Sequence, residues 1–353
     1  MFEIKNTLSF NTDKLVEGSD FDYITRTSLN QGILRETGFV NSENINESGC
    51  WSLGLLQMDF FYRKKHWYAG QFVRKVIPKF QLTENIILYF STLLNKQKSK
   101  LLPVLVRNID TTFLSLLIQL PITSTGEIDF AFMENFISEL EEERISELNA
   151  YLEVTGLKDY TLTPEEDESI KDFKEMEWGE FEIGELFDFL TSKKRFDANK
   201  VNILENGNYP YIVRTSLNNG IKGYLNENEE YLNSGNTISF GQDTATIFYQ
   251  KEPYFTGDKI KIVKAKDDFF NAKNALYFLT SMNKSFQVYS WGSSSFNVDI
   301  LSKEKMFLPL QNNSLNYPFM ETFISAIQKL VIKDVVLYAD KKINATKSIT
   351  TKP

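Results

Sequence analysis

An eleven-residue stretch, Tyr211-Ile-Val-Arg-Thr-Ser-Leu-Asn-Asn-Gly-Ile221, occurs twice in this chain. The earlier copy, Tyr23-Ile-Thr-Arg-Thr-Ser-Leu-Asn-Gln-Gly-Ile33, lies 188 positions before it and differs only at Thr25 and Gln31. Each copy closes with Asn-Gly or Gln-Gly, which is typical of a strand running into a turn. The stretch therefore predicts two related structural units, each built around one copy.

Neighbouring segments recur in the same order at nearly the same spacing. The clearest is Phe132-Met-Glu-Asn-Phe-Ile-Ser138, which returns as Phe319-Met-Glu-Thr-Phe-Ile-Ser325. Shorter matches are Phe61-Tyr62 with Phe248-Tyr249, Gly70 with Gly257, and Leu120-Pro121 with Leu308-Pro309. At the start we align Phe2-Glu-Ile4 with Phe181-Glu-Ile183, which makes the first copy the more abbreviated one. This order predicts the internal duplication of a whole domain and of the segment that follows it.

Length and composition agree with two ordinary globular units. A chain of 353 residues corresponds to about two domains, and 42% hydrophobic with 24% charged residues is a typical globular balance. The single Cys50 excludes an internal disulfide and suits a reducing compartment. We see no signal peptide after Met1 and no apolar run long enough for a membrane span. The chain is expected to be cytoplasmic, without a membrane partner.

Each half is predicted to be strand-rich before a long helix. Between residues 21 and 120, short segments rich in Tyr, Phe, Ile and Val are separated by Gly, Asn and Ser, a pattern typical of strands. A helix is expected at 84–94, capped by Thr83, with Ile87, Leu88 and Leu94 facing inward. The matching stretch 272–282 is expected to be helical too.

Two long helices are predicted from their apolar period. The first starts after Asp129 as N-cap, ends at Gly156, and carries its acids on the opposite face. The second starts near Pro318 and continues to about residue 345. Because each apolar stripe is longer than one small domain would cover, we expect the helices to pack on each other, antiparallel if the halves are related by a pseudo-two-fold axis. Residues 157–177 are interpreted as an acidic linker.

The charge distribution bears on possible partners. A net charge of −8 argues against nucleic-acid binding by the chain as a whole. The acids are concentrated between residues 134 and 168, however, and basic clusters such as Lys193-Lys-Arg195 lie elsewhere. A local basic face is therefore compatible with the sequence.

Three segments could carry binding chemistry. The repeated Arg-Thr-Ser-Leu-Asn offers a guanidinium with hydroxyl and amide groups for phosphates and base edges, or it is a turn preserved because it folds well. Ser239-Phe-Gly-Gln-Asp-Thr-Ala-Thr246 presents Gln and Thr side chains that can read bases, or it is a polar hairpin tip. Trp291-Gly-Ser-Ser-Ser-Phe296 could approach a phosphate or be a solvated connection.

Catalytic and metal-binding patterns are scarce. The single histidine, His66, has no cysteine or second histidine to join in a triad or metal site, and no GxxxxGK[ST] phosphate loop occurs. We expect no catalytic residue, no metal and no bound cofactor. From the residues alone an enzyme built on paired carboxylates stays open, although nothing in the sequence points to one.

The second half resembles the specificity subunits of type I restriction-modification systems. The segments that carry the resemblance are Trp178-Gly-Glu-Phe-Glu-Ile-Gly-Glu-Leu-Phe187, Tyr209-Pro-Tyr-Ile-Val-Arg-Thr-Ser-Leu-Asn-Asn-Gly-Ile221, Ile247-Phe-Tyr249 with Phe255, and Phe307-Leu-Pro309 before a long helix. The first half shares it through the repeat, more weakly after Lys98.

This resemblance implies an α+β fold with two tandem strand-rich target recognition domains and a helix after each. The expected boundaries are recognition domain 1 at 1–128, spacer helix 1 and linker at 129–177, recognition domain 2 at 178–317, and spacer helix 2 and tail at 318–353. In this family each domain reads half of a bipartite site in double-stranded DNA, and an antiparallel coiled coil sets the gap. Modification subunits that bind S-adenosylmethionine, and restriction subunits, supply the catalysis, so the resemblance implies that this chain is not an enzyme.

The candidate DNA contacts follow from the residue types together with the resemblance. The repeated loops contribute Arg26, Thr27, Ser28, Asn30, Arg214, Thr215, Ser216 and Asn218; base reading is assigned to Gln242, Thr244 and Thr246; and phosphates to Lys65, Lys193, Lys194 and Arg195. Because the loops are alike, bases are expected to be read where the copies differ, near 242–246 and 55–59. Two alternatives stay open: a specificity subunit of a type II system with a bipartite site, and a duplicated scaffold that does not bind DNA.

Overall fold

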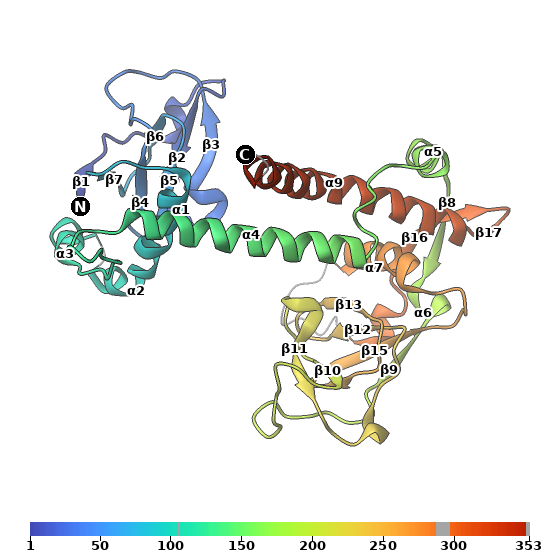
Figure 1. Ribbon diagram of the computed structural model, residues 1–353. Coiled ribbons are helices and arrows are strands. Elements are labelled where there is room, and N and C mark those ends of the chain that lie inside the picture. The colour runs from blue at the N-terminus through green and yellow to red at the C-terminus, as the bar shows by residue number, and fades with distance from the viewer. Residues whose placement is uncertain (105, 287–296, 351–353) are drawn as a thin grey trace. The chain divides into compact units, whose positions relative to one another are not determined.

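The computed structural model describes residues 1–104, 106–286 and 297–350, without the side chains of 346–350; Trp291–Phe296 lies outside the described residues. The chain divides into two compact units (Figure 1). Unit 1 comprises Met1–Leu148 with the end of the chain from Ile343, and unit 2 comprises Asn149–Lys342. No described helix is long and apolar enough to cross a membrane.

Unit 1 contains two small sheets. The first has the strand order β1-β7-β4-β5, and the second has the order β3-β2-β6, in which β2 and β6 run parallel. The strands are β1 (Phe2–Asn6), β2 (Phe21–Ile24), β3 (Ile33–Thr37), β4 (Cys50–Gly54), β5 (Asp59–Arg63), β6 (Trp67–Ala69) and β7 (Val73–Pro78). The α-helices are α1 (Glu84–Lys96), α2 (Lys98–Leu101), α3 (Ile109–Ser115) and the start of α4 (Phe130–Val154). The core between the four-stranded sheet and α1 contains Trp51, Phe60 and Phe90.

Unit 2 repeats this arrangement and adds a third sheet. Its strand orders are β9-β15-β12-β13, β11-β10-β14 and β17-β16-β8. The strands are β8 (Glu177–Glu182), β9 (Phe187–Thr191), β10 (Tyr209–Ile212), β11 (Ile221–Leu225), β12 (Thr237–Gly241), β13 (Thr246–Gln250), β14 (Phe255–Thr256), β15 (Ile260–Ala265), β16 (Lys305–Gln311) and β17 (Ser314–Leu315). The α-helices are α5 (Pro164–Asp172), α6 (Ile183–Leu186), α7 (Ala272–Phe286), α8 (Val298–Leu301) and most of α9 (Tyr317–Thr350). The predicted α+β fold, with a long helix after each strand-rich half, is confirmed.

The matching strand orders show that the start of the first copy aligns with a different segment of the second copy than the sequence comparison indicated. Ile4 pairs with Val76, and Phe189 pairs with Val263, which lies at the position equivalent to Val76. β1 therefore corresponds to β9, and the alignment of Phe2-Glu-Ile4 with Phe181-Glu-Ile183 was wrong. β8 precedes the repeated part and pairs with β16 instead. A short Phe-Glu-Ile match cannot identify a strand, because register depends on the partner strand.

The predicted helices are present, with three corrections. Thr83 caps α1 through Ile86 N–H at 3.2 Å, but Leu88 is exposed, because Ile86, Phe90 and Leu94 form the buried face at four-residue spacing. The second correction concerns α9, where the apolar period predicts that Val331 faces inward: Val331 is 74% exposed, and the buried residues include Ala326 and Ala339.

The third correction concerns the acidic linker, which contains α5. Thr163 and Glu166 form a capping box with Pro164 in the first turn, a signal that the acidic composition concealed. Burial alone would raise the pKa of Glu166, but the backbone N–H of Thr163 and the ammonium of Lys329 hold it below its ordinary value. Lys329 lies 2.9 Å from Glu166 and so ties α9 to α5.

The ends of α4 are set by the residues that the sequence indicated. Asp129 accepts a hydrogen bond from Phe132 N–H at 2.8 Å, and Gly156 takes a left-handed φ of +71° after the helix. The final residues of α4, from Asn149, belong to the same compact unit as residues 317–342 of α9. In that unit Leu152, Val336 and Ala339 are buried.

Candidate nucleic-acid interface

The two copies of the repeated stretch have the same backbone geometry. Each runs from a central strand, β2 or β10, through three successive left-handed residues into β3 or β11. Gly32 and Gly220 both have φ of +80°, and the residues before them, Asn30-Gln31 and Asn218-Asn219, have φ between +45° and +52°. Asn tolerates this region better than most residues, which explains the Asn-rich turn.

Each copy is anchored from its own tyrosine. Tyr23 donates to Phe10 O at 2.5 Å, and Tyr211 donates to Phe196 O at 2.7 Å. A side chain added at Gly70 would come within 3.0 Å of the Tyr23 hydroxyl, and one at Gly257 within 3.1 Å of the Tyr211 hydroxyl. The Gly70 and Gly257 match in the sequence therefore reflects close packing on this tyrosine.

A buried side chain donates a hydrogen bond to the backbone of each loop. Arg63 Nε donates to Ser52 Oγ at 2.9 Å, and its guanidinium also donates to Gln31 O. Gln250 occupies the same place in unit 2, where its amide donates to Ser239 Oγ at 3.0 Å and to Asn219 O at 3.1 Å. The loops are thus held at equivalent positions by different chemistry.

Several predicted contact residues also stabilise the loop itself. Thr27 accepts from Leu29 N–H at 3.1 Å, and Thr215 accepts from Leu217 N–H at 3.2 Å. The amides of Asn30 and Asn218 donate to Ile33 O and Ile221 O. Ser216 is exposed, and Ser28 donates to Asp59. These polar groups lie at the exposed edge of the loop but each Thr and Asn has a local partner.

The arginines of the two loops differ in their surroundings. Arg214 forms an ion pair with Asp243, which also pairs with Lys259 at 2.8 Å. The hydrogen bond and charge of Lys259, with the charge of Arg214, hold the pKa of Asp243 below its ordinary value. Arg26 instead lies over the ring of Phe72, with its guanidinium carbon 5.3 Å from the centroid.

A surface depression of about 780 Å³ in unit 2 brings several predicted residues together. Its lining includes Arg195, Arg214 and Thr244 from three separate segments, with Lys222 from β11. Arg195 pairs with Asp258, which also lines the depression, at 3.1 Å. Sequence reasoning missed Lys222, although its position directly after the repeated Ile221 could have indicated it. Two carboxylates, Asp197 and Asp258, line the depression as well, so its charged lining consists of three cations and two acids.

The remaining candidates lie at different places. Lys193 and Lys194 are exposed beside Arg195, and the Lys194 ammonium lies 4.2 Å from the Tyr231 ring centroid. Thr244 and Thr246 share a hydrogen bond of 2.9 Å at the β12–β13 turn, where Gln242 is half-buried. Lys65 follows the end of β5 that lies away from the β4–β5 turn, where it pairs with Glu36 at 2.9 Å. The structure therefore does not bring Lys65 to the repeated loop.

The expectation for residues 55–59 was wrong in part. Leu55 and Met58 are fully buried in the core of unit 1, and Asp59 pairs with Lys98 at 2.6 Å. An isolated apolar pair in a turn can face the core, and the sequence pattern could not tell which residues do. Leu56 remains exposed at this turn.

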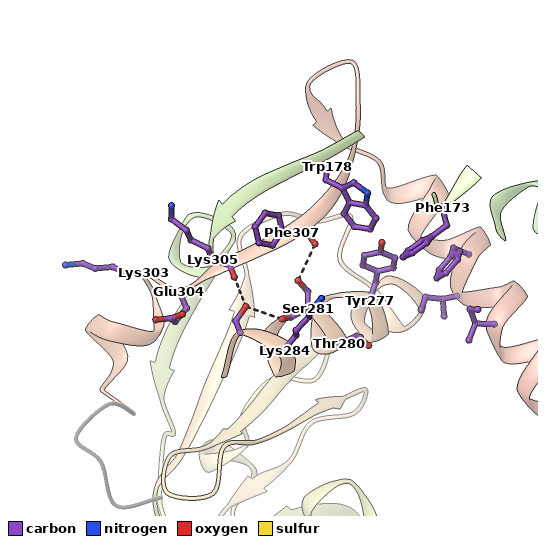
Figure 2. A pocket seen from close by; sticks show the side chains of 14 residues that line it. Phe173, Trp178, Tyr277, Thr280, Ser281, Lys284, Lys303, Glu304, Lys305 and Phe307 are labelled. Carbon is purple, nitrogen blue, oxygen red and sulfur yellow. Dashed lines mark hydrogen bonds between the residues drawn. The ribbon is translucent and has the colours of Figure 1, made fainter. Parts of the chain in front are cut away.

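A second hollow in unit 2, of about 1160 Å³, has a different character (Figure 2). Aromatic side chains line it, among them Phe173, Trp178, Tyr277 and Phe307. Ser285 Oγ donates to Lys305 O at 2.6 Å on one wall. None of the predicted DNA contacts lines this hollow, and its apolar surface suits a protein side chain better than a phosphate.

The part of the chain that the structure describes contains no group of three metal-ligating side chains. His66 accepts from Ser48 N–H at 3.0 Å and so has a structural role.

The family model described as type I restriction modification DNA specificity domain matches residues 1–150 and 175–338. The chain therefore belongs to this family: it is a restriction-modification specificity subunit, a class of subunit that is not itself catalytic. This membership decides against the scaffold alternative.

Two relatives illustrate the range of the family. The S subunit of the type I system of M. genitalium has the same fold, with a TM-score of 0.52 and 13% identity over 99% of this chain and 91% of that one. The specificity subunit S.BcgI of a type II restriction enzyme from Heyndrickxia coagulans is 32% identical over 154 residues. That match covers 43% of this chain and 44% of the relative.

Proposed function

We propose that this chain recognises a bipartite target in double-stranded DNA and directs partner modification and restriction subunits to it. One recognition domain, residues 1–128, reads one half of the site, and the other, residues 178–317, reads the second half. The helical segments 129–177 and 318–353 set the number of base pairs between the halves.

The observation that carries this proposal is the depression beside the repeated loop, whose charged lining has three cations and two acids. Arg195 and Thr244 lie there beside Arg214 and Lys222, which flank the turn between β10 and β11. Guanidinium and ammonium groups bind phosphates, while Gln and Thr side chains hydrogen-bond base edges. A local excess of cations over acids allows a chain of net charge −8 to bind a polyanion.

The test compares single-charge variants in the complex assembled with its modification subunits. Lys222→Ala should weaken binding to all DNA sequences and lower the slope of log K against log salt by about 1. Lys251→Ala is the matched control, because Lys251 is an exposed lysine that follows the end of β13 opposite to the turn. If both variants bind with the wild-type slope, the depression is not the DNA interface.

Base reading is tested separately from phosphate binding. Gln242→Ala should relax the sequence preference at one position of the site, by about 1 to 3 kcal/mol. Arg214→Ala removes a candidate contact and also leaves Asp243 with Lys259 alone. Specific binding as tight as wild type in Arg214→Ala would remove Arg214 from the interface.

Partner subunits are proposed to dock on the helices. The exposed side chains of α9 include Val331 at 74% and Leu330 at 45%, and Phe323, Ile324 and Ile327 line the aromatic hollow. Exposed apolar surface of this extent is typical of protein interfaces. The acids on α4 favour a protein partner over phosphates on that helix.

A type II specificity subunit is the second candidate function. The similarity to S.BcgI favours it over part of the chain. Cleavage assays of the complete complex decide between them, because cuts on both sides of the site are expected of the type II system.

A further inference from the structure

The tips of the two units have the same backbone but opposite surface chemistry. In unit 1 the turn after β4 ends at Met58 with φ of +55°, and in unit 2 the turn after β12 ends at Ala245 with φ of +52°. Leu55 N–H donates to Phe72 O at 2.9 Å, and Gln242 N–H donates to Lys259 O at 3.0 Å. Leu56 is thus equivalent to Asp243, and Phe72 to Lys259.

The β3 and β11 strands extend this relation. Leu34 follows the repeated Ile33 as Lys222 follows Ile221. Lys222 lines the depression with Arg214 and Thr244, so Leu34 occupies the corresponding position in unit 1. Three positions that are charged in unit 2 are therefore apolar in unit 1.

These apolar side chains are exposed although the framework around them is shared. Leu34 is 52% exposed, and Leu56 and Phe72 are each 44% exposed. Arg26 lies on the Phe72 ring, where its counterpart Arg214 pairs with Asp243. Leaving large apolar groups in water is unfavourable, and such surface in a recognition loop indicates a ligand with apolar groups of its own.

We infer that unit 1 recognises its half-site by apolar contact of Leu56 and Phe72 with thymine methyl groups in the major groove. Unit 2, by contrast, reads its half-site through hydrogen bonds. The thymine methyl is the apolar group that base pairs present in that groove. The occupant is DNA because the apolar patch adjoins the loop that both units share, with Arg26 and Ser28 at its edge. This inference rests on the proposed function and adds how the two half-sites differ.

The test replaces thymine by deoxyuridine, which removes the methyl group and keeps every hydrogen-bonding group. Binding is measured with the complex assembled with its modification subunits. The duplex carries the target sequence found by mapping methylated adenines in the source genome. The half-site of unit 2 is the one whose preference changes in Gln242→Ala. Each contacted methyl removed from the half-site of unit 1 should weaken binding about fourfold, and replacements in the half-site of unit 2 should have no effect.

A matched protein variant tests the residues. Leu56→Asp with Phe72→Lys transfers the Asp243 and Lys259 pair to equivalent backbone positions, so its thermal unfolding should stay near that of wild type. This variant should lose the difference between thymine and deoxyuridine duplexes. If this variant no longer assembles with modification subunits although its thermal unfolding stays near that of wild type, the inference is overturned and the patch is a protein-docking surface.

The outcomes separate this inference from the proposed function. If wild type shows no specific, salt-dependent DNA binding, the proposed function itself fails. If wild type binds specifically but no thymine in the half-site of unit 1 is sensitive to deoxyuridine, only the methyl-contact inference is overturned.

Discussion

Exchange of the buried Arg63 tests whether the repeated loops share one framework. Arg63 is 2% exposed and supports the loop through Ser52 Oγ and Gln31 O. Gln250 makes the equivalent bonds in unit 2. Arg63→Gln therefore introduces a side chain that the same backbone already accommodates in the other half.

The expected free energies follow from burial and hydrogen bonding. Burial lowers the pKa of Arg63 from 12.5 to about 10, which corresponds to about 3 kcal/mol for keeping the charge out of water. Each hydrogen bond from a charged donor contributes about 1.5 to 3 kcal/mol, so two bonds offset this cost. The free energy of unfolding of Arg63→Gln should stay within about 1 kcal/mol of wild type, since the variant no longer buries a charge and keeps hydrogen bonds from a neutral amide.

Arg63→Ala should behave differently. It leaves Gln31 O and Ser52 Oγ without their donor and opens a cavity beside Phe61, whose ring centroid lies 5.7 Å from the guanidinium carbon. Unpaired polar groups and lost packing should then destabilise unit 1 by about 3 kcal/mol.

Urea unfolding followed by tryptophan fluorescence measures both variants. Trp51 and Trp67 are fully buried in unit 1, so a background with Trp178→Phe and Trp291→Phe reports on that unit alone. Equal destabilisation by Arg63→Gln and Arg63→Ala would refute the shared framework, and so would a neutral Arg63→Ala.

Three further predictions concern other contacts. Because the pKa of Asp243 is depressed, its ion pairs stabilise unit 2 fully above the unfolded carboxyl pKa of about 4, and this stabilisation is lost as the pH falls through the folded pKa. Asp243→Asn should therefore flatten the acid side of a plot of melting temperature against pH. An unchanged plot would contradict the assignment. Lys329→Met should lower the free energy of unfolding of unit 2 by about 2 to 3 kcal/mol in urea, because it leaves the buried Glu166 without its partner. Lys171→Met, on the exposed face of α5, should change it by less than about 0.5 kcal/mol. Similar losses in both variants would argue against the contact between α5 and α9. Phe90→Ala should destabilise unit 1 by about 3 to 5 kcal/mol while Leu88→Ala has little effect, since only Phe90 is buried, and thermal unfolding distinguishes them.

The duplication was predictable because its signal is long and ordered. Tyr211–Ile221 and its copy form two loops in which the tyrosine, threonine and asparagine hydrogen bonds match. The periodic patterns predicted α1, α4 and α9. The start of the repeat was not predictable, because β1 and β9 pair with equivalent strands, β7 and β15, but have dissimilar sequences. The prediction for the turn at 55–58 failed for a related reason, since Leu55 and Met58 face the core only because β4 and β5 pack on α1.

The candidate site was predictable in its residue types but not in its grouping. The basic residues Arg195 and Arg214 were visible in the sequence, yet only the fold shows that they line one depression with Lys222. The partner of Arg214, Asp243, lies in another hairpin, so no spacing rule could pair them. The exposed side chains Leu29 and Leu217, at 78% and 74%, lie inside the repeat and were overlooked because they are apolar.

A map of methylated adenines in the source genome, made with wild type and with this gene deleted, tests the central claim most directly. The account predicts one bipartite motif that disappears on deletion, with the preference in a single half altered in the Gln242→Ala strain. A continuous motif, or a map that deletion leaves unchanged, would contradict it.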